Sequence, residues 1–302
     1  MMPFRRILFP VDFSNATTAM APAVKEIAQR FDSTVTLLTA FNLIREYNLA
    51  PNVENTLDSE PAAIPYSQAL QELRDRRKRR LEEFAHAHFP NISHSLMIED
   101  GDPAMVIEWA ARHMNTDLIM IPTRGLGLFR CLLLGSVTAK VLHDVNCPVL
   151  TSPHNSDPVL TPLSGFRSII CAVELNYQAD EVFRAAGLLA QTYGARICLL
   201  SIEPLSGENA GQSTPQSVKH AFERALGSGG PGIGADTSVR IMSAEFPEGV
   251  LRIAIEESAD LVVVGRGHSS GIFSRAWSHL YSIIRESPCA VLSVRLTPLV
   301  RL

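Results

Sequence analysis

The sequence has few of the features that mark membrane proteins, disulfide-rich proteins or nucleic-acid-binding proteins. No segment approaches the roughly 18 consecutive apolar residues of a membrane-spanning helix. The five cysteines are odd in number, widely spaced and without a CxxC pair, which argues against a disulfide framework or a CxxC metal site. Charged residues make up only 19% of the chain, and the net charge is −4. We therefore expect a soluble cytoplasmic protein with no membrane or nucleic-acid partner.

Several catalytic and nucleotide-binding motifs are also absent. The chain has no GxxxxGK[ST] loop, no GxGxxG at the start of its first helix and no GxSxG elbow. Ser14 and Ser136 lack an identifiable base, and the histidines between residues 86 and 113 show no metal-ligand spacing. We find no catalytic constellation, so the sequence indicates a protein that is not an enzyme, or at most a weak ATPase.

One basic run, residues 74–80, suggests a nucleic-acid patch when it is taken alone. Acidic residues at positions 72, 75, 82 and 83 surround it on the same predicted helix. Such mixed charge is more typical of a solvated helix face with pairs at i,i+4 spacing.

What the sequence does contain is an alternation of apolar strands and amphipathic helices. In the first half, strands are predicted over residues 6–11, 33–40, 94–99, 117–121 and 147–152, and helices over residues 16–31, 68–87, 102–114 and 136–144. Residues 41–67 contain three prolines and are predicted to be an irregular connection. Continuous apolar strands separated by helices are typical of a parallel sheet covered on both faces.

The pattern then restarts, which indicates an internal duplication. Residues 168–174 mirror 7–12, and residues 260–265 mirror 117–122. A length of 302 residues suits two domains of about 150 residues each. We predict a first domain over residues 1–152, a linker over 153–165 and a second domain over 166–302. Five glycines within residues 227–234 predict a flexible loop before the third strand of the second copy.

A glycine-bearing stretch follows the fourth strand of the first half. Gly125 and Gly127 would let a loop bring backbone N–H groups close to an anion. Gly135 and Ser136 then open a helix, where Ser136 can cap the helix and offer its hydroxyl and N–H groups to the same anion. The stretch predicts a phosphate cradle, although the glycines would also suit ordinary turns and a helix start.

Asp12 lies just past the first strand, as Gly125 lies just past the fourth. Open parallel sheets bind ligands at the carboxyl ends of their strands, where the strand order reverses. If the first and fourth strands are neighbours, the two residues flank one crevice. Asp12 would then accept hydrogen bonds from a ribose or adenine while the glycines and Ser136 take the phosphates. The alternative is that Asp12 only caps the helix that begins near residue 15.

With these motifs together, both halves resemble universal stress protein domains, and the chain resembles a tandem member of that family over nearly its full length. The family's ATP-binding signature is Gly-x2-Gly-x9-Gly-Ser/Thr, and the chain matches it from residue 122 to Ser136 with Pro122 in place of the first glycine. Further family landmarks lie at residues 7–14, 37–40 and 101–104.

The resemblance implies a Rossmann-like fold of the adenine-nucleotide α-hydrolase type, with five parallel strands in each doubly wound domain. It also implies a stress-response sensor or modulator that holds ATP, or ADP or AMP, with or without Mg²⁺. The predicted binding residues are Asp12, Ala40, Arg124, Gly125, Gly127, Gly135 and Ser136. The other hypothesis is a nucleotide-free interaction scaffold or dimerisation module.

Pro122 bears on the choice between these hypotheses. Proline has no N–H group, so any hydrogen bond that the family's first glycine donates is absent. One neutral hydrogen bond contributes roughly 0.5–1.5 kcal/mol, so we expect binding to weaken about tenfold or less. Arg124 could compensate by pairing with a phosphate, or it could be a solvated loop residue.

The second copy departs further from the signature. Glu174 replaces the aspartate, and Trp277 or Ser278 takes the place of the glycine that precedes the helix. A tryptophan there would fill the volume that a phosphate needs, so we expect this copy to be degenerate for ATP. Arg266 and His268 are its candidate anion contacts.

The resemblance also carries an expectation about assembly. The fifth strands of family members commonly pair across a dimer. Here residues 148–151 and 290–294 could pair within one chain, which predicts an intramolecular pseudo-dimer and leaves a further homodimer open.

Overall fold

The structure is a computed structural model that describes residues 4–42, 66–124, 134–153, 165–173, 179–203, 205, 213–227, 236–267 and 275–296. The first half contains β1 (Arg6–Pro10), α1 (Asn15–Phe31), β2 (Thr34–Phe41), α3 (Tyr66–His88), β3 (His94–Asp100), α4 (Pro103–His113), β4 (Leu118–Ile121), α5 (Ser136–Asp144) and β5 (Val149–Thr151). The second half contains β6 (Ser168–Val173), α6 (Asp180–Tyr193), β7 (Arg196–Glu203), α7 (Pro215–Leu226), β8 (Thr237–Ser243), α8 (Phe246–Glu256), β9 (Leu261–Arg266), α9 (Arg275–Glu286) and β10 (Ala290–Arg295). The predicted alternation of strands and helices is confirmed in both halves.

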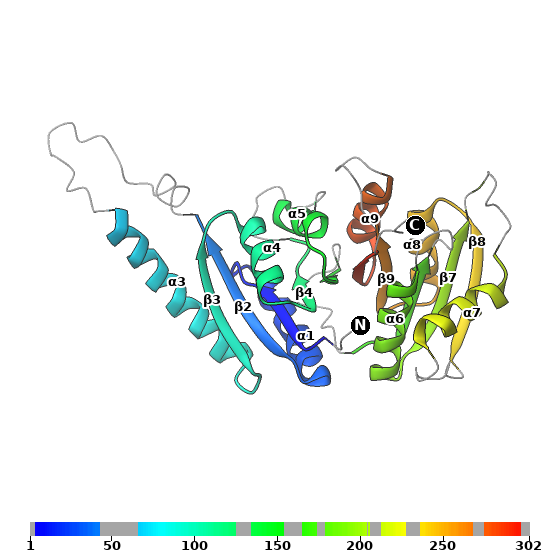
Figure 1. Cartoon of the computed structure of the whole chain (residues 1–302), viewed down its shortest axis with the longest axis horizontal. Coiled ribbons are helices and arrows are strands. Elements are labelled where there is room, and N and C mark those ends of the chain that lie inside the picture. The colour runs from blue at the N-terminus through cyan, green and yellow to red at the C-terminus, as the bar shows by residue number, and fades with distance from the viewer. Residues whose placement is uncertain are drawn as a thin grey trace, which may run out of the picture.

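All ten strands form one sheet, in the order β3-β2-β1-β4-β5-β10-β9-β6-β7-β8. Within each half every strand pair is parallel. The two halves join where β5 and β10 pair antiparallel, with Leu150 opposite Leu292. The predicted pairing of the two fifth strands is therefore present within the chain, and the halves lie side by side in Figure 1.

Helices cover both faces of this sheet, as expected for doubly wound units. One hydrophobic cluster contains buried residues of α1, α3, α6 and α7, and the other contains buried residues of α4, α5, α8 and α9. The central strands explain this layering, because all four residues of β4 and all six of β6 are buried. A strand that is apolar on both faces must be covered on both faces.

Some segment boundaries differ from the sequence predictions. The connection predicted over residues 41–67 is shorter, because Phe41 still belongs to β2 and α3 already begins at Tyr66. Most of that connection, residues 43–65, lies outside the described residues, as do residues 154–164 of the predicted linker and residues 228–234 of the predicted glycine-rich loop. Among the helices that the structure describes, none is long and apolar enough to cross a membrane.

Candidate functional site

The candidate site lies where the strand order reverses in the first half. β1 pairs in parallel with β2 on one side and with β4 on the other, so the first and fourth strands are neighbours. Asp12 follows the end of β1 and Arg124 follows the end of β4, which places both at the carboxyl edge of the sheet. This geometry meets the condition set by the sequence and forms the kind of crevice in which doubly wound sheets bind ligands.

Asp12 has structural partners on one of its two carboxylate oxygens. Oδ1 accepts hydrogen bonds from the Ser14 N–H at 2.9 Å and from the Thr17 hydroxyl at 2.5 Å. Ser14, and not Asp12, is the N-cap of α1, since its side chain accepts from the Thr17 N–H. The Oδ2 atom of Asp12 has no hydrogen-bond partner among the described residues. Asp12 therefore supports the start of α1 and still has one oxygen for a ligand.

The residue after Asp12 has an unusual backbone conformation. Phe13 adopts φ = 60°, in the left-handed region that bulky side chains rarely enter. Its ring packs under two cations of α3, with the guanidinium carbons of Arg80 and Arg77 at 4.4 Å and 6.0 Å from the ring centroid. Such strain is common beside binding sites, and here it turns the chain between Asp12 and Ser14.

On the other side of the crevice, the end of β4 is tied to the start of α5. The Gly135 N–H donates to the Thr123 carbonyl at 3.0 Å, and the Thr138 hydroxyl donates to the Pro122 carbonyl at 2.9 Å. Gly135 has an ordinary φ of −55°, but a Cβ atom there would lie 3.3 Å from the Thr123 oxygen. Close approach of two chain segments, and not a special backbone angle, therefore favours glycine at this position.

Sequence reasoning missed Thr138. It is buried, and its hydroxyl anchors the first turn of α5 to the end of β4. The available signal was a threonine two residues after the Gly-Ser pair, a position that the family signature does not include.

Ser136 differs from the prediction in one respect. It is the first residue of α5 and is exposed, whereas Gly135 is the N-cap and provides no side-chain cap. The expectation that Ser136 caps this helix is wrong by one position. The consequence suits a phosphate site, because no side chain in the described part of the chain satisfies the first N–H groups of α5.

Arg124 and Ala40 complete the described candidates. Arg124 is half-buried, and its Nε is a buried nitrogen without a hydrogen-bond partner among the described residues. Ala40 is half-buried near the carboxyl end of β2, where it is in register with Glu99 of β3. Gly125 and Gly127 lie outside the described residues, so their part in the cradle stays a prediction.

The chain also matches known proteins in both of its halves. A model of the Universal stress protein family matches residues 3–153 and 165–295. The chain belongs to this family. A universal stress protein from Thermus aquaticus is 30% identical over 147 residues, which cover 49% of this chain and 97% of that relative. A second, from Methanocaldococcus jannaschii, is 29% identical over 147 residues, which cover 49% of this chain and 81% of that relative.

Among solved structures, a universal stress protein from Archaeoglobus fulgidus has a similar fold over the whole length. The TM-score is 0.71 with 20% sequence identity, and the match covers 96% of this chain and 98% of that one. At this identity the likeness concerns the fold. The shared fold extends over both halves of this chain.

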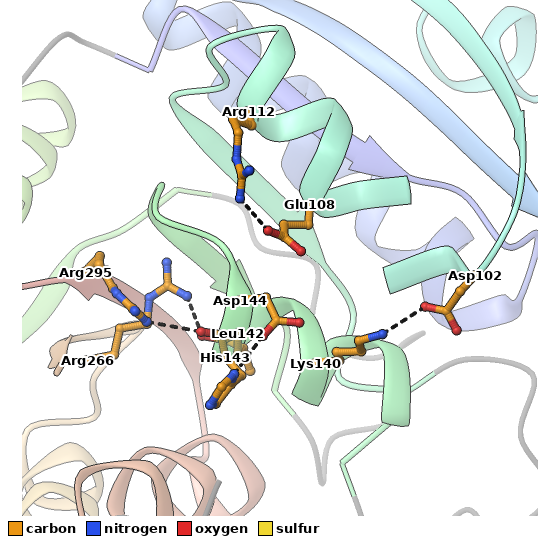
Figure 2. A network of polar contacts seen from close by, with 9 residues as sticks. All are labelled: Asp102, Glu108, Arg112, Lys140, Leu142, His143, Asp144, Arg266 and Arg295. Atoms are coloured by element: carbon orange, nitrogen blue, oxygen red, sulfur yellow. Dashed lines mark hydrogen bonds and ion pairs between the residues drawn. The ribbon is translucent and has the colours of Figure 1, made fainter. Parts of the chain in front are cut away.

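The second universal stress protein unit uses its corresponding residues differently. Arg266, at the end of β9, is only 3% exposed and does not lie free for an anion at its own crevice as predicted. Its guanidinium reaches into the first half, where Nη1 donates to the Leu142 carbonyl at 2.5 Å (Figure 2). Its Nη2 donates to the Cys147 carbonyl. Sequence spacing within one unit could not reveal a contact that forms only across the junction.

Trp277 also faces the junction. It lies in the first turn of α9, and its ring contacts His143 of α5 edge to face, with the ring centroids 5.6 Å apart. An indole therefore lies within the first turn of α9, whereas Gly135 directly precedes the first residue of α5. Glu174 and His268 lie outside the described residues.

Proposed function

We propose that the first half binds an adenine nucleotide, ATP in preference to ADP or AMP, in the crevice between β1 and β4. Asp12 and Ala40 would hold the nucleoside, and Arg124, Gly125, Gly127, Gly135 and Ser136 would hold the phosphates and any Mg²⁺ they carry. One observation carries this proposal. The free carboxylate oxygen of Asp12 and the uncapped N-terminus of α5 lie on the two sides of the crevice where the strand order reverses.

The described residues fit such a ligand in charge as well as in position. Phosphates are anionic, and the N-terminus of α5 presents N–H groups and a positive helix dipole end. Arg124 adds a buried donor without a protein partner. Ribose and adenine carry N–H and O–H donors, which the remaining oxygen of Asp12 can accept.

We further propose that nucleotide binding serves signalling in the cytoplasm and not catalysis. α5 has its N-terminus at the crevice, while the carbonyls of Leu142 and His143 near its other end accept bonds from the second half. A nucleotide that orders the first turn of α5 would thereby act on the junction between the halves. It could shift a conformational equilibrium only by its difference in affinity for the two states.

A second candidate function is a nucleotide-free scaffold. The continuous ten-stranded sheet and the indole of Trp277 favour it, because both serve the union of the halves and neither needs a ligand. The two functions differ in one observable: only the first requires ATP to bind at Gly135.

Isothermal titration of nucleotide-free protein with ATP tests the location of the site. Gly135→Trp should abolish detectable binding, because its side chain would enter a space already only 3.3 Å from the Thr123 oxygen. Asp12→Asn should weaken binding roughly 10- to 150-fold while retaining an oxygen for Ser14 and Thr17, since a hydrogen bond to a charged group contributes about 1.5–3 kcal/mol.

Ser278→Ala, at the corresponding helix start of the second half, is the matched control for Ser136→Ala. Only the change at Ser136 should weaken ATP binding. Variants at Gly135 and Asp12 that fold and bind ATP as tightly as the wild type would move the site elsewhere.

A further inference from the structure

The junction between the halves holds two arginines side by side. Arg266 and Arg295 are register partners at the ends of β9 and β10. Arg295 Nη1 donates to the His143 carbonyl at 3.1 Å, as Arg266 donates to two other carbonyls of the first half. Figure 2 shows both guanidinium groups directed at the last turn of α5. Their hydrogen-bond acceptors are neutral carbonyls, and neither guanidinium forms an ion pair with a carboxylate among the described residues.

Three nitrogens around this point lack partners. Arg266 Nε, Arg295 Nε and His143 Nε2 are buried and accept or donate no hydrogen bond within the described part of the chain. They come from residues that line one small hollow, together with Leu142, Gly267, Trp277 and Leu280. Buried polar atoms in native proteins are nearly always paired, so three in one place indicate a missing partner.

The positive charge of the two arginines indicates that the missing partner is negatively charged. Burial, and beyond it the positive charge of Arg295, lowers the pKa of Arg266 to about 10, so this guanidinium is still charged at neutral pH. Asp144 is the nearby carboxylate, and its Oδ1 accepts from His143 Nδ1 at 2.7 Å. One buried and one half-buried guanidinium on neighbouring strands favour an anion beside them.

The size of the hollow limits the class of ligand. Its total empty volume is about 230 Å³, including space open to solvent. The enclosed space within it is only about 10 Å³, roughly what one water molecule needs, so the hollow suits a species of very few atoms and not a nucleotide.

We propose that a small inorganic anion binds between Arg266 and Arg295 and bridges the two halves of the chain. The anion would accept hydrogen bonds from the two Nε–H groups and neutralise part of their charge. It would thereby stabilise the contact of β9 and β10 with the end of α5. This site is separate from the proposed nucleotide crevice, which lies at the other end of α5.

Thermal unfolding of the full chain at constant ionic strength tests this proposal. Chloride or inorganic phosphate would replace gluconate, which is too large for the hollow. At least one of the two ions should raise the Tm of the wild type saturably by about 2–4 °C. Arg295→Gln should remove this rise, whereas Arg167→Gln, which alters an exposed arginine elsewhere in the second half, should keep it.

A crystal of the wild type soaked in bromide gives a second measurement that does not depend on a variant that folds. An anomalous peak between the two guanidinium groups is expected. Absence of that peak, absence of a saturable Tm rise with either ion, or an equal rise in Arg295→Gln would each overturn the proposal. An equal rise in that variant would place the ion elsewhere, for example in the nucleotide crevice.

Discussion

Pro122 is the residue that most separates this chain from the signature of its family. It lacks the N–H group of the usual glycine, yet its carbonyl accepts the Thr138 hydroxyl and so holds α5 against the end of β4. Glycine at this position would keep that carbonyl. The departure therefore concerns a single donor and leaves the anchoring of the helix intact.

This arrangement makes Pro122→Gly an informative variant. We expect ATP to bind more tightly by about tenfold or less, because the restored N–H can donate one neutral hydrogen bond worth roughly 0.5–1.5 kcal/mol. Isothermal titration beside the wild type measures the change. Pro148→Gly, just before β5, controls for the flexibility that glycine introduces and should leave affinity unchanged. Weaker binding by Pro122→Gly would show that the loop depends on the fixed φ of proline.

At the level of single residues, the sequence predicts the position of a residue in the fold better than its structural role. It predicts that Asp12 and Gly125 lie at one sheet edge, and the structure places Asp12 and Arg124, the neighbour of Gly125, at that edge, because residues after neighbouring parallel strands share it. It assigned the helix cap to Ser136 instead of Gly135, since the exact first residue of a helix depends on local geometry. It left Arg266 in its own unit, because a contact across the junction has no signal in local spacing.

The strands and helices were the most predictable elements. Apolar runs such as residues 118–121 fill both faces of a buried strand, and the duplication repeated each signal. The register of β5 against β10 could not come from either run alone. The family resemblance predicts only that the two strands pair, and the structure has this pairing and adds its register.

Two helices on the other face of the sheet also join the halves. The Tyr193 hydroxyl of α6 donates to Glu26 Oε2 of α1 at 2.5 Å, and the Arg30 guanidinium lies 5.2 Å from the centroid of the Tyr193 ring. Glu26 also pairs with Arg30 at 3.2 Å. Burial, followed by the bond to Glu26, raises the pKa of Tyr193 well above its ordinary value.

This raised pKa predicts a dependence of stability on alkaline pH. The unfolded chain loses the tyrosine proton near pH 10, whereas the folded chain keeps it to higher pH. The contribution of Tyr193 is therefore complete below pH 10 and is lost as the pH rises beyond it. Tyr193→Phe should cost about 1 kcal/mol of unfolding free energy at neutral pH, because Arg30 still satisfies Glu26.

Denaturant titrations of the wild type and Tyr193→Phe at several pH values measure this effect. The difference between the two proteins should shrink above pH 10. A difference that stays constant through that range would mean that the hydroxyl does not hold its proton in this contact.

At the scale of the whole molecule, the sheet is nearly symmetric but the two units are not. In the first unit, α5 extends from the crevice to the junction. Arg266 and Arg295 of the second unit donate hydrogen bonds to carbonyls near the end of that helix. Gly135 provides no side-chain cap for α5, whereas Trp277 lies in the first turn of α9 and contacts His143. The proposed function therefore assigns nucleotide binding to the first unit and support of the junction to the second.

The stoichiometry of ATP binding to the nucleotide-free wild-type chain tests this division of roles. Calorimetric titration should give one ATP per chain, because the first crevice combines an uncapped helix start with the free oxygen of Asp12, whereas the second unit has Trp277 in the first turn of α9 and a buried Arg266. Two equivalents per chain would contradict the assignment of ATP binding to the first unit alone. No binding at all, in protein shown to be folded and free of nucleotide, would contradict the nucleotide function itself.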